Sequence, residues 1–308
     1  MKLTIATINL NNLDGLQRTL PSIFAQTYTE YELIVVDGAS TDGSKEFIAS
    51  QQRVDIWVSE PDHGIYEAMN KAVKLAHGDY CLFMNSGDIF FSPQALEQSV
   101  DSLDGCDYIA GHSVFVENFK SYTYVPPCEL SHEYLFINAL NHQALFTRTE
   151  ILRQYPYNEN MRIVSDWEQY FRTWYLHGCT YKKLNAYVAV FFLDGISTVN
   201  WPRQLKERDE CVRRLIADSE GEKRQILKES YEKFLKEHPW MNPAHKEDTP
   251  ETETLTRKER KRKRRNKYRE RMRRKLEKSL RKASPFQRDL SVVRYGLKYF
   301  FKDLFLWW

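Results

Sequence analysis

The stretch Tyr80-Cys-Leu-Phe-Met-Asn-Ser-Gly-Asp88 joins a short apolar run to a polar turn. Residues 80–84 are sufficient for one fully buried strand. The turn that follows places a carboxylate just beyond the carboxyl end of that strand, where ligands bind in open α/β sheets. An aspartate in a turn can also simply order the backbone or cap a helix. The neighbouring sequence has to decide between these two roles for Asp88.

Similar apolar runs precede this strand. Residues 3–8, 32–36 and 54–59 read as strands, whereas residues 13–25 and 67–77 carry apolar side chains at helical spacing. A further helical segment separates the second strand from the third. Alternation of strands and helices is the signature of parallel βαβ units. We therefore expect an α/β fold with a mostly parallel central sheet, flanked by helices, whose loops converge on one edge.

The composition allows one large domain with an appendage, since 42% of the 308 residues are hydrophobic and 14% are aromatic. The formal net charge of +3 conceals a marked asymmetry. Residues 257–282 hold seventeen Lys and Arg against three Glu, a net of +14, so the other residues together carry −11. This basic block is expected to have a partner that the acidic remainder does not share.

Cysteine usage and apolar runs indicate the compartment. The five cysteines are scattered and odd in number, which argues against a disulfide framework or a zinc site and suits a reducing environment. The chain enters an apolar strand directly at its N-terminus, without a signal-peptide pattern. No apolar run approaches the roughly 20 residues that span a bilayer. We expect a cytoplasmic protein.

Two common phosphate-binding loops are missing from the sequence. The loop that follows Asp37 lacks a Gly-x-Gly-x-x-Gly run, which disfavours a Rossmann dinucleotide site, and no Gly-Lys-Ser/Thr loop occurs. Other motifs follow one another in order over about ninety residues. They are Thr7 and Asn9 after the first strand, Val-Val-Asp37-Gly-Ala-Ser-Thr-Asp42-Gly-Ser, Asp62-His-Gly-Ile-Tyr-x-Ala-Met-Asn70-Lys71, Gly78-Asp79 and Asn85-Ser-Gly-Asp88. Together they resemble the nucleotide-sugar half of family 2 inverting glycosyltransferases of the GT-A fold, especially the branch that assembles bacterial exopolysaccharide, capsule and lipopolysaccharide.

The resemblance continues into an acceptor half and covers roughly residues 1–200. Asn141-His-Gln-Ala-Leu-Phe146 reads as a strand entered by polar residues. Val164-Ser-Asp-Trp-Glu168 precedes a helix at the place where the family usually has Glu-Asp, and the family's base then falls on Asp166. Ser165 stands in place of the usual Glu. Residues 192–197 resemble the flexible loop that closes the family's active site.

The resemblance implies transfer of a sugar from a nucleoside diphosphate to an acceptor hydroxyl with inversion. Mg²⁺ or Mn²⁺ would neutralise the leaving diphosphate, and Asp88 stands where the family often has Asp-x-Asp, of which only the last acid is present. Asp166 would take the acceptor's proton. The alternative for Asp166 is a helix N-cap, and the alternative base is Glu168, a carboxylate that the helix dipole also favours in a first turn.

The remaining site residues lie on the nucleotide side or at the rim. Asp37 resembles the acid that binds the nucleotide's base, Thr7 would line the same pocket, and Asp62 lies nearby. Thr7 and Asp62 can equally be local turn or cap residues. Asn70 and His142 are candidates for the rim, although such residues in polar loops often serve structure alone.

Together these expectations divide the chain into a catalytic domain and three following segments. The catalytic domain comprises residues 1–200, with its nucleotide-sugar half at about 1–110 and its acceptor half at about 111–200. A helical extension that packs on the core follows at 201–245. An acidic linker at 246–256 then leads to a basic helix with an amphipathic aromatic tail at 257–308.

The tail predicts a partner of its own. From Val293 onward an aromatic helical face lies opposite Arg294, Lys298 and Lys302, a pattern typical of helices that lie in a membrane interface. The basic block would add attraction to anionic lipid. We therefore expect peripheral association with the inner face of the cell membrane. The alternative is that the aromatic face docks on the catalytic domain or on a second subunit.

Two other functions compete with this interpretation. The basic block could bind nucleic acid through phosphates, with the front domain as a scaffold. No RNA- or DNA-binding module is recognisable, and the end of the chain is apolar, so no nucleic-acid partner is expected. A nucleotidyltransferase on a similar sheet is the alternative enzyme, and the absence of a Gly-rich loop with Lys or Arg after the first strand disfavours it.

Overall fold

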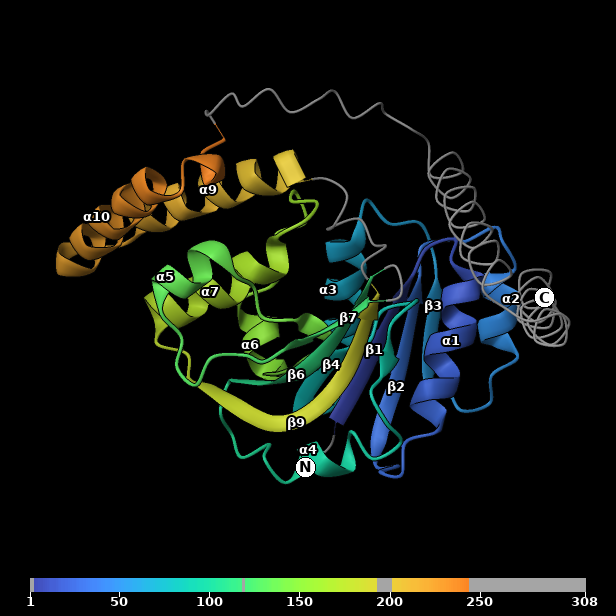
Figure 1. Ribbon diagram of the computed structural model, residues 1–308. Coiled ribbons are helices and arrows are strands. Elements are labelled where there is room, and N and C mark those ends of the chain that lie inside the picture. The colour runs from blue at the N-terminus through green and yellow to red at the C-terminus, as the bar shows by residue number, and fades with distance from the viewer. Residues whose placement is uncertain (1–2, 118–119, 193–200, 244–308) are drawn as a thin grey trace, which may run out of the picture. The chain divides into compact units, whose positions relative to one another are not determined.

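The computed structural model describes residues 3–117, 120–192 and 201–243, and all statements below concern these residues (Figure 1). Three sequence-based predictions lie outside them. These are most of the loop at 192–197, the linker at 246–256 and the basic and aromatic tail at 257–308.

The first half of the chain alternates strands and helices in the order that the apolar runs predict. Its elements are β1 (Leu3–Asn9), α1 (Leu13–Phe24), β2 (Tyr31–Asp37), α2 (Ser44–Ala49), β3 (Ile56–Ser59), α3 (Ile65–Leu75), β4 (Tyr80–Phe83), β5 (Ile89–Phe90) and α4 (Glu97–Val100). β1 pairs in parallel with β2 and β4, and β2 pairs in parallel with β3. The carboxyl ends of these four strands therefore meet at one edge.

The second half adds strands of mixed direction and most of the helices. Its elements are β6 (Tyr108–Glu117), β7 (Lys120–Tyr124), α5 (His132–Ile137), the 3₁₀ turn η1 (His142–Ala144), β8 (Leu145–Arg148), α6 (Thr149–Gln154), α7 (Ser165–His177), β9 (Tyr181–Phe192), α9 (Trp201–Asp218), α10 (Gly221–Glu237) and η2 (Pro239–Met241). The strand order is β3-β2-β1-β4-β8-β6-β9-β5, with β7 paired to β6. β8 runs antiparallel to both β4 and β6. The predicted α/β fold is confirmed, with a parallel first half and a mixed second half.

Helices cover both faces of the parallel strands. Successive side chains of a strand point to opposite faces, so Ile5 of β1 packs with Leu16 of α1, whereas Ile8 packs with Met69 and Val73 of α3. Figure 1 shows α1 and α2 on one side of β1 to β3 and α3 and α6 on the other. Burial on both faces explains why these strands are nearly continuous apolar runs.

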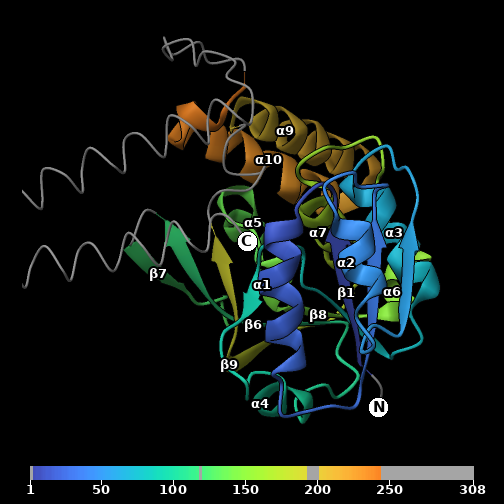
Figure 2. The same cartoon turned by 90° about the vertical axis from the view of Figure 1, so that its right-hand side faces the viewer.

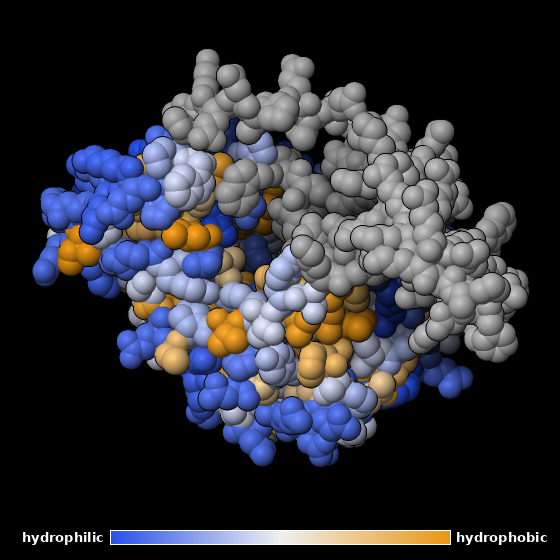
Figure 3. Space-filling model, in the orientation of Figure 1, coloured by the Kyte–Doolittle hydropathy of each residue, from blue (hydrophilic) through white to orange (hydrophobic). Residues whose placement is uncertain are grey.

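A separate cluster holds the helices of the second half against the sheet. Side chains from β6, α5, α7, α9 and α10 meet in it, among them Tyr108, Phe136, Trp167, Val212 and Phe234. The outer surface of α9 and α10 is largely hydrophilic (Figure 3). None of the described helices has the length and apolar character needed to span a bilayer.

β7 lies outside the main strand order and pairs with β6, which is itself flanked by β8 and β9. Figure 2 shows β7 apart from β1 and from helices α2 and α3. β6 pairs in parallel with β9, and the register shifts between Ala110 and His112 and again between His112 and Ser113.

The prediction of a strand over residues 141–146 is wrong at its start. Ala144 N donates to Asn141 O, which closes the 3₁₀ turn, and β8 begins only at Leu145. The polar side chains that precede the strand leave the β ladder and instead contact the Asn85–Asp88 turn. This departure from the strand forms part of the site described next.

Candidate active site

Asp37 lies at the carboxyl end of β2, in register with Asn9 of β1 and Ser59 of β3. Asn9 Nδ2 donates to its Oδ1 at 2.8 Å, and Ser59 Oγ donates to its Oδ2 at 2.8 Å. Ser40 donates to both oxygens, through its backbone N–H at 2.9 Å and its hydroxyl at 2.5 Å. The carboxylate is fully buried and fixes the loop that follows the strand.

Asp62 and Thr7 lie at the same edge of the sheet. Asp62 Oδ1 accepts the N–H of Gly64 at 3.0 Å, and its Oδ2 lies so close to Gly38 that a Cβ there would come within 2.5 Å. Burial raises the pKa of Asp62, although the Gly64 N–H and the charge of Lys71 oppose the rise. Thr7 is buried in β1, and its Oγ1 has no hydrogen-bond partner among the described residues.

The Asn85–Asp88 turn is fixed by α1. Thr19 Oγ1 donates to Asp88 O at 2.7 Å and accepts the Gly87 N–H at 2.9 Å. Gly87 has a φ of +114°, a left-handed conformation that favours glycine. Ser86 N donates to Ile8 O, so the turn stays anchored to β1. Asp88 is therefore held rigidly beyond β4, and it is 7% exposed.

Two amide side chains, Asn85 and Gln143, lie in and beside this turn. Gln143 Nε2 donates to Asp88 Oδ2 at 2.7 Å, and Asn85 Nδ2 lies 3.2 Å from His142 Nε2. The amide oxygens of Asn85 and Gln143 are buried and have no partner among the described residues. Oxygen ligands of this kind fit Mg²⁺ or Mn²⁺, and Mg²⁺ commonly takes only one or two protein carboxylates beside phosphate and water. The described residues contain no cluster of three or more His, Cys, Asp or Glu that could hold a metal by itself.

Asp166 is the second residue of α7, and Val164 rather than Asp166 occupies the N-cap position. Tyr66 OH donates to Asp166 Oδ1 at 2.9 Å, and His142 Nδ1 lies 3.3 Å from Oδ2. Burial alone would raise the pKa of Asp166, but the hydrogen bond and charge of His142, with the Tyr66 hydroxyl, lower it below its ordinary value. The carboxylate is thus ionised at neutral pH and can accept a proton.

His142 and Gln143 join the two predicted centres. His142 contacts Asp166 through one ring nitrogen and Asn85 through the other, and the next residue contacts Asp88. Since all these contacts pass through the single turn η1, Asp88 and Asp166 belong to one connected set of polar side chains.

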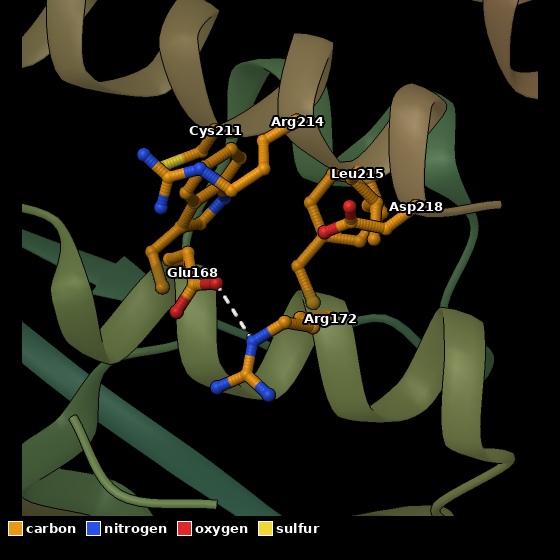
Figure 4. Close-up of a pocket in the computed structure, with 8 residues that line it drawn as sticks. Glu168, Arg172, Cys211, Arg214, Leu215 and Asp218 are labelled. Atoms are coloured by element: carbon orange, nitrogen blue, oxygen red, sulfur yellow. Dashed lines mark hydrogen bonds and ion pairs between the residues drawn. The ribbon is translucent and has the colours of Figure 1, made fainter. Parts of the chain in front are cut away.

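Glu168, the alternative base, lies in different surroundings. It forms an ion pair with Arg172 Nε at 2.8 Å, one turn along α7. Figure 4 shows both side chains at a cavity between α7 and α9, where Cys211 and Leu215 also line the wall. The cavity measures about 10 Å³, enough for one water molecule and far too small for a sugar. Neither Tyr66 nor His142 is hydrogen-bonded to Glu168 in the described contacts.

Asn70 is hydrogen-bonded to the loop between α6 and α7. Its Nδ2 donates to Tyr157 O and Glu159 Oε1, both at 2.9 Å, and its Oδ1 accepts the Tyr157 N–H at 3.0 Å. These hydrogen bonds hold the segment that leads to α7 against α3. None of them joins Asn70 to another predicted site residue.

Three side chains that serve the site were not assigned a role from the sequence. Tyr66 and Gln143 stand within quoted motifs next to predicted residues, so their motif positions were the available signal. Thr19 lies in the middle of a regular helix pattern, where nothing distinguishes it from other helical residues.

Known proteins resemble this chain in sequence. The family model of glycosyl transferase family 2 matches residues 4–166. An uncharacterised glycosyltransferase of Mycobacterium tuberculosis is 41% identical over 104 residues, which cover 33% of this chain and 40% of that protein. The match thus spans less than half of the relative's length.

Solved structures resemble it in fold. S. aureus TarS 1-349 in complex with UDP-GlcNAc has a TM-score of 0.61 at 16% identity, covering 79% of this chain and 74% of that one. The mannosyltransferase PcManGT of Pyrobaculum calidifontis, in complex with GDP-Man and Mn²⁺, has a TM-score of 0.57 at 17% identity, covering 78% and 72%. The GT-A fold expected from the sequence is confirmed. With its matched region extending over more than half of its residues, the chain belongs to glycosyl transferase family 2.

Proposed function

We propose that this protein is an inverting glycosyltransferase, which moves a sugar from a nucleoside diphosphate sugar to an acceptor hydroxyl in a divalent-metal-dependent reaction. The observation that carries the proposal is the polar set in which Asp88 and Asp166 are joined through η1. One of these carboxylates follows a parallel strand of the nucleotide side, and the other begins a helix of the second half. A sugar lying between them would have a diphosphate on one side and an acceptor on the other.

On the nucleotide side, the residues at the carboxyl ends of β1 and β2 recognise the donor. Asp62 supplies acceptors beside Gly38, and Thr7 offers a hydroxyl. Asp37 accepts from Asn9, Ser40 and Ser59 and so holds the loop that meets the donor. Asp88 would hold Mg²⁺ or Mn²⁺ against the diphosphate oxygens, and the ion would neutralise the charge that develops on the leaving group. Gln143 keeps the Asp88 carboxylate in one orientation.

On the acceptor side, Asp166 accepts the proton of the attacking hydroxyl. A bond forms between the acceptor oxygen and the anomeric carbon while the bond from that carbon to the phosphate oxygen breaks, and the nucleoside diphosphate leaves. A single displacement of this kind inverts the anomeric configuration. Tyr66 and His142 orient the carboxylate and keep it ionised, which supports its role as base.

Binding of the donor tests this function first. We expect one of UDP-, GDP- or dTDP-sugars, with Mn²⁺, to raise Tm by roughly 5 °C or more at a hundredfold excess over its Kd. The measurement is thermal unfolding with each nucleotide sugar, with and without the metal. A folded protein that none of these donors stabilises would contradict the proposal.

Removal of His142 is expected to shift the pH dependence of turnover. The pKa of Asp166 lies below its ordinary value because His142 and Tyr66 outweigh burial. In His142→Ala burial dominates, so the pKa of Asp166 rises. The acid limb of the kcat profile, the pH range in which kcat falls as Asp166 takes up a proton, therefore moves to higher pH.

The lowered pKa of Asp166 also affects stability. The ionised form of Asp166 stabilises the fold above its unfolded pKa, and that contribution is lost as pH falls through the lower folded pKa.

The pH profile of kcat for His142→Ala, Tyr66→Phe and the control His77→Ala checks this prediction. Tyr66→Phe should move the limb in the same direction by less, because the contribution of His142 to the pKa of Asp166 is larger. His77 contacts Glu32 rather than Asp166, so its variant should leave the limb in place. An unchanged limb in His142→Ala would show that the histidine does not tune the base.

We further propose that the acceptor is a saccharide, in this branch a lipid-linked saccharide of the cell envelope, and that residues 257–308 hold the enzyme at an anionic membrane surface. The support is the basic block and the two-faced helical pattern of the sequence. Membrane binding would raise the local concentration of a lipid-linked acceptor without altering the chemistry.

Deletion of residues 284–308 removes the aromatic face and keeps the basic block, so it is expected to weaken binding to anionic vesicles and to leave turnover on a short, water-soluble acceptor nearly unchanged. Vesicle flotation of the full and shortened chains at low and high salt measures this. Binding of the full chain should weaken with salt, because screening acts over a Debye length of about 8 Å at physiological ionic strength. If the shortened chain unfolds or loses a subunit partner without vesicles, the tail packs on protein instead.

A further inference from the structure

Glu207 lies on α9, beyond the region that the family model matches. Its side chain is 10% exposed. It accepts three successive backbone N–H groups, those of Arg162 at 3.1 Å, Ile163 at 2.9 Å and Val164 at 3.3 Å. Arg203, one turn earlier on α9, completes the arrangement with an ion pair at 2.9 Å.

These three N–H groups belong to the last residues before α7. Val164 is the N-cap residue of α7, and its apolar side chain gives the helix no capping hydrogen bond. A carboxylate near a helix N-terminus is favoured by the helix dipole and by the unpaired N–H groups there. Glu207, on the distant helix α9, therefore accepts the N–H of Val164, for which the N-cap side chain offers no acceptor. Asp166 follows only two residues after Val164.

The same segment also touches the nucleotide side. The Arg162 side chain donates to His63 O, in the loop that leads to Tyr66. Because Tyr66 and Asp166 are hydrogen-bonded, the backbone that Glu207 holds is tied to both partners of that contact. A shift of this backbone would therefore change how the base is presented.

Arg208, the next residue on α9, supports the same arrangement from another direction. It is 6% exposed, and its Nη1 donates to Ile137 O, at the end of α5, at 3.0 Å. Its guanidinium lies 4.8 Å from the centre of the Trp167 ring, and Trp167 is the neighbour of Asp166. Figure 1 shows α9 beside α7, as these contacts require.

We propose that Glu207 is a positioning residue for Asp166, so that the helical extension is part of the catalytic unit and not an accessory to it. The inference rests on the proposed function, in which Asp166 is the base. Glu207 touches no substrate; it fixes the backbone before α7 and so the distance from Asp166 to the acceptor hydroxyl. A misplacement of about 1 Å can lower a rate by about 10²-fold.

The test compares Glu207→Ala and Glu207→Gln with Glu210→Gln, whose side chain on the same helix is 55% exposed. The reaction is Mn²⁺-dependent hydrolysis of UDP-GlcNAc or GDP-mannose, whichever stabilises the protein, with water as the acceptor. We expect kcat to fall about 10²-fold in Glu207→Ala with the donor KM unchanged. Glu207→Gln should fall less, because one amide oxygen can still accept, and Glu210→Gln should match the parent.

A second readout separates positioning from simple loss of stability. In Glu207→Gln the backbone amides of residues 162–166 should exchange hydrogen faster, while those of β1 and β2 keep their protection. If Glu207→Ala does not fold, the kcat and the hydrogen-exchange pattern of Glu207→Gln test the positioning role. Unchanged kcat in folded Glu207 variants, or a kcat loss no larger than the unfolded fraction, would overturn the inference.

The two proposals fail in different ways. If Asp166→Asn is inactive and the Glu207 variants retain full kcat, the base stands and only the positioning role is lost. If Asp166→Asn retains turnover, the assignment of the base itself is wrong, whatever the Glu207 variants do.

Discussion

Asp166→Asn is expected to lower turnover by a factor of about 10²–10⁴, the usual contribution of a positioned proton acceptor. Asparagine has the same size, and its amide oxygen can still accept the hydrogen bond of Tyr66. It cannot take a proton from the acceptor hydroxyl. The free energy of unfolding should fall by about 3 kcal/mol or less, since the Tyr66 hydrogen bond keeps a neutral acceptor and only the His142 contact loses its acceptor oxygen. Turnover with saturating donor and Mn²⁺, together with denaturant unfolding, measures both effects.

Glu168→Gln is the matched control on the same helix. Glu168 pairs with Arg172 and faces the small cavity between α7 and α9, so its variant should turn over at nearly the parent rate. Activity that survives Asp166→Asn but disappears in Glu168→Gln would mean that the wrong carboxylate has been assigned.

Asp88→Asn is expected to abolish metal-dependent turnover and to weaken Mn²⁺ binding in the presence of the nucleotide by at least about 100-fold. Loss of a residue that merely supports a metal ligand already costs about 10–100-fold, and here the charged ligand itself is removed. The fold should persist, because the amide oxygen can still accept from Gln143 and because Thr19 holds the backbone of Asp88 rather than its side chain. Titration of Mn²⁺ against protein and nucleoside diphosphate, by electron paramagnetic resonance, measures the affinity.

Asp42→Asn provides the comparison for that experiment. Asp42 is another aspartate in a turn, and its oxygens accept the Leu13 N–H and the Ser44 hydroxyl. Its variant should bind Mn²⁺ and turn over as the parent does. Normal turnover of Asp88→Asn at saturating Mn²⁺ would remove the metal role from this residue.

The sequence predicts where the strands lie and which strands end in an aspartate, because both features depend on short local stretches of residues. Residues 80–84 form a continuous apolar run and residues 3–8 are interrupted only by Thr4 and Thr7, since helices cover both faces of their strands. Asp37 and Asp88 come directly after such runs, so parallel pairing alone places them at one edge. The family resemblance then predicts Asp166 from its position before a helix.

The partners of these acids could not be predicted in the same way, because they come from distant parts of the chain. Tyr66 and Asp166 are 100 residues apart, and Thr19 and Asp88 are 69 apart. The strand expected at 141–146 is shortened because His142 and Gln143 turn towards the Asn85–Asp88 turn, an interaction that no local pattern reports. Glu207 reads in the sequence only as one more charged residue of a polar helix.

Among the described residues, few side chains link Asp88 on the nucleotide side of the site with Asp166 on the acceptor side. The turn η1 contacts the Asp88 turn and Asp166, and Arg162 reaches from the start of α7 to the loop before Tyr66. Substitutions at these contacts should therefore alter turnover more than they alter binding of the nucleotide. Substitutions around Asp37 should do the reverse, because the side-chain hydrogen bonds of Asp37 lie within the first three strands and their loops.

The anomeric configuration of the first product tests the central claim most directly. A donor from the stabilisation screen whose sugar is α-linked to the diphosphate is hydrolysed with Mn²⁺, and proton nuclear magnetic resonance follows the released sugar before it mutarotates. Single displacement with Asp166 as base predicts that the β anomer appears first, and that Asp166→Asn and Asp88→Asn release almost none. Initial release of the α anomer, or no release of nucleoside diphosphate from any stabilising donor, would contradict the account.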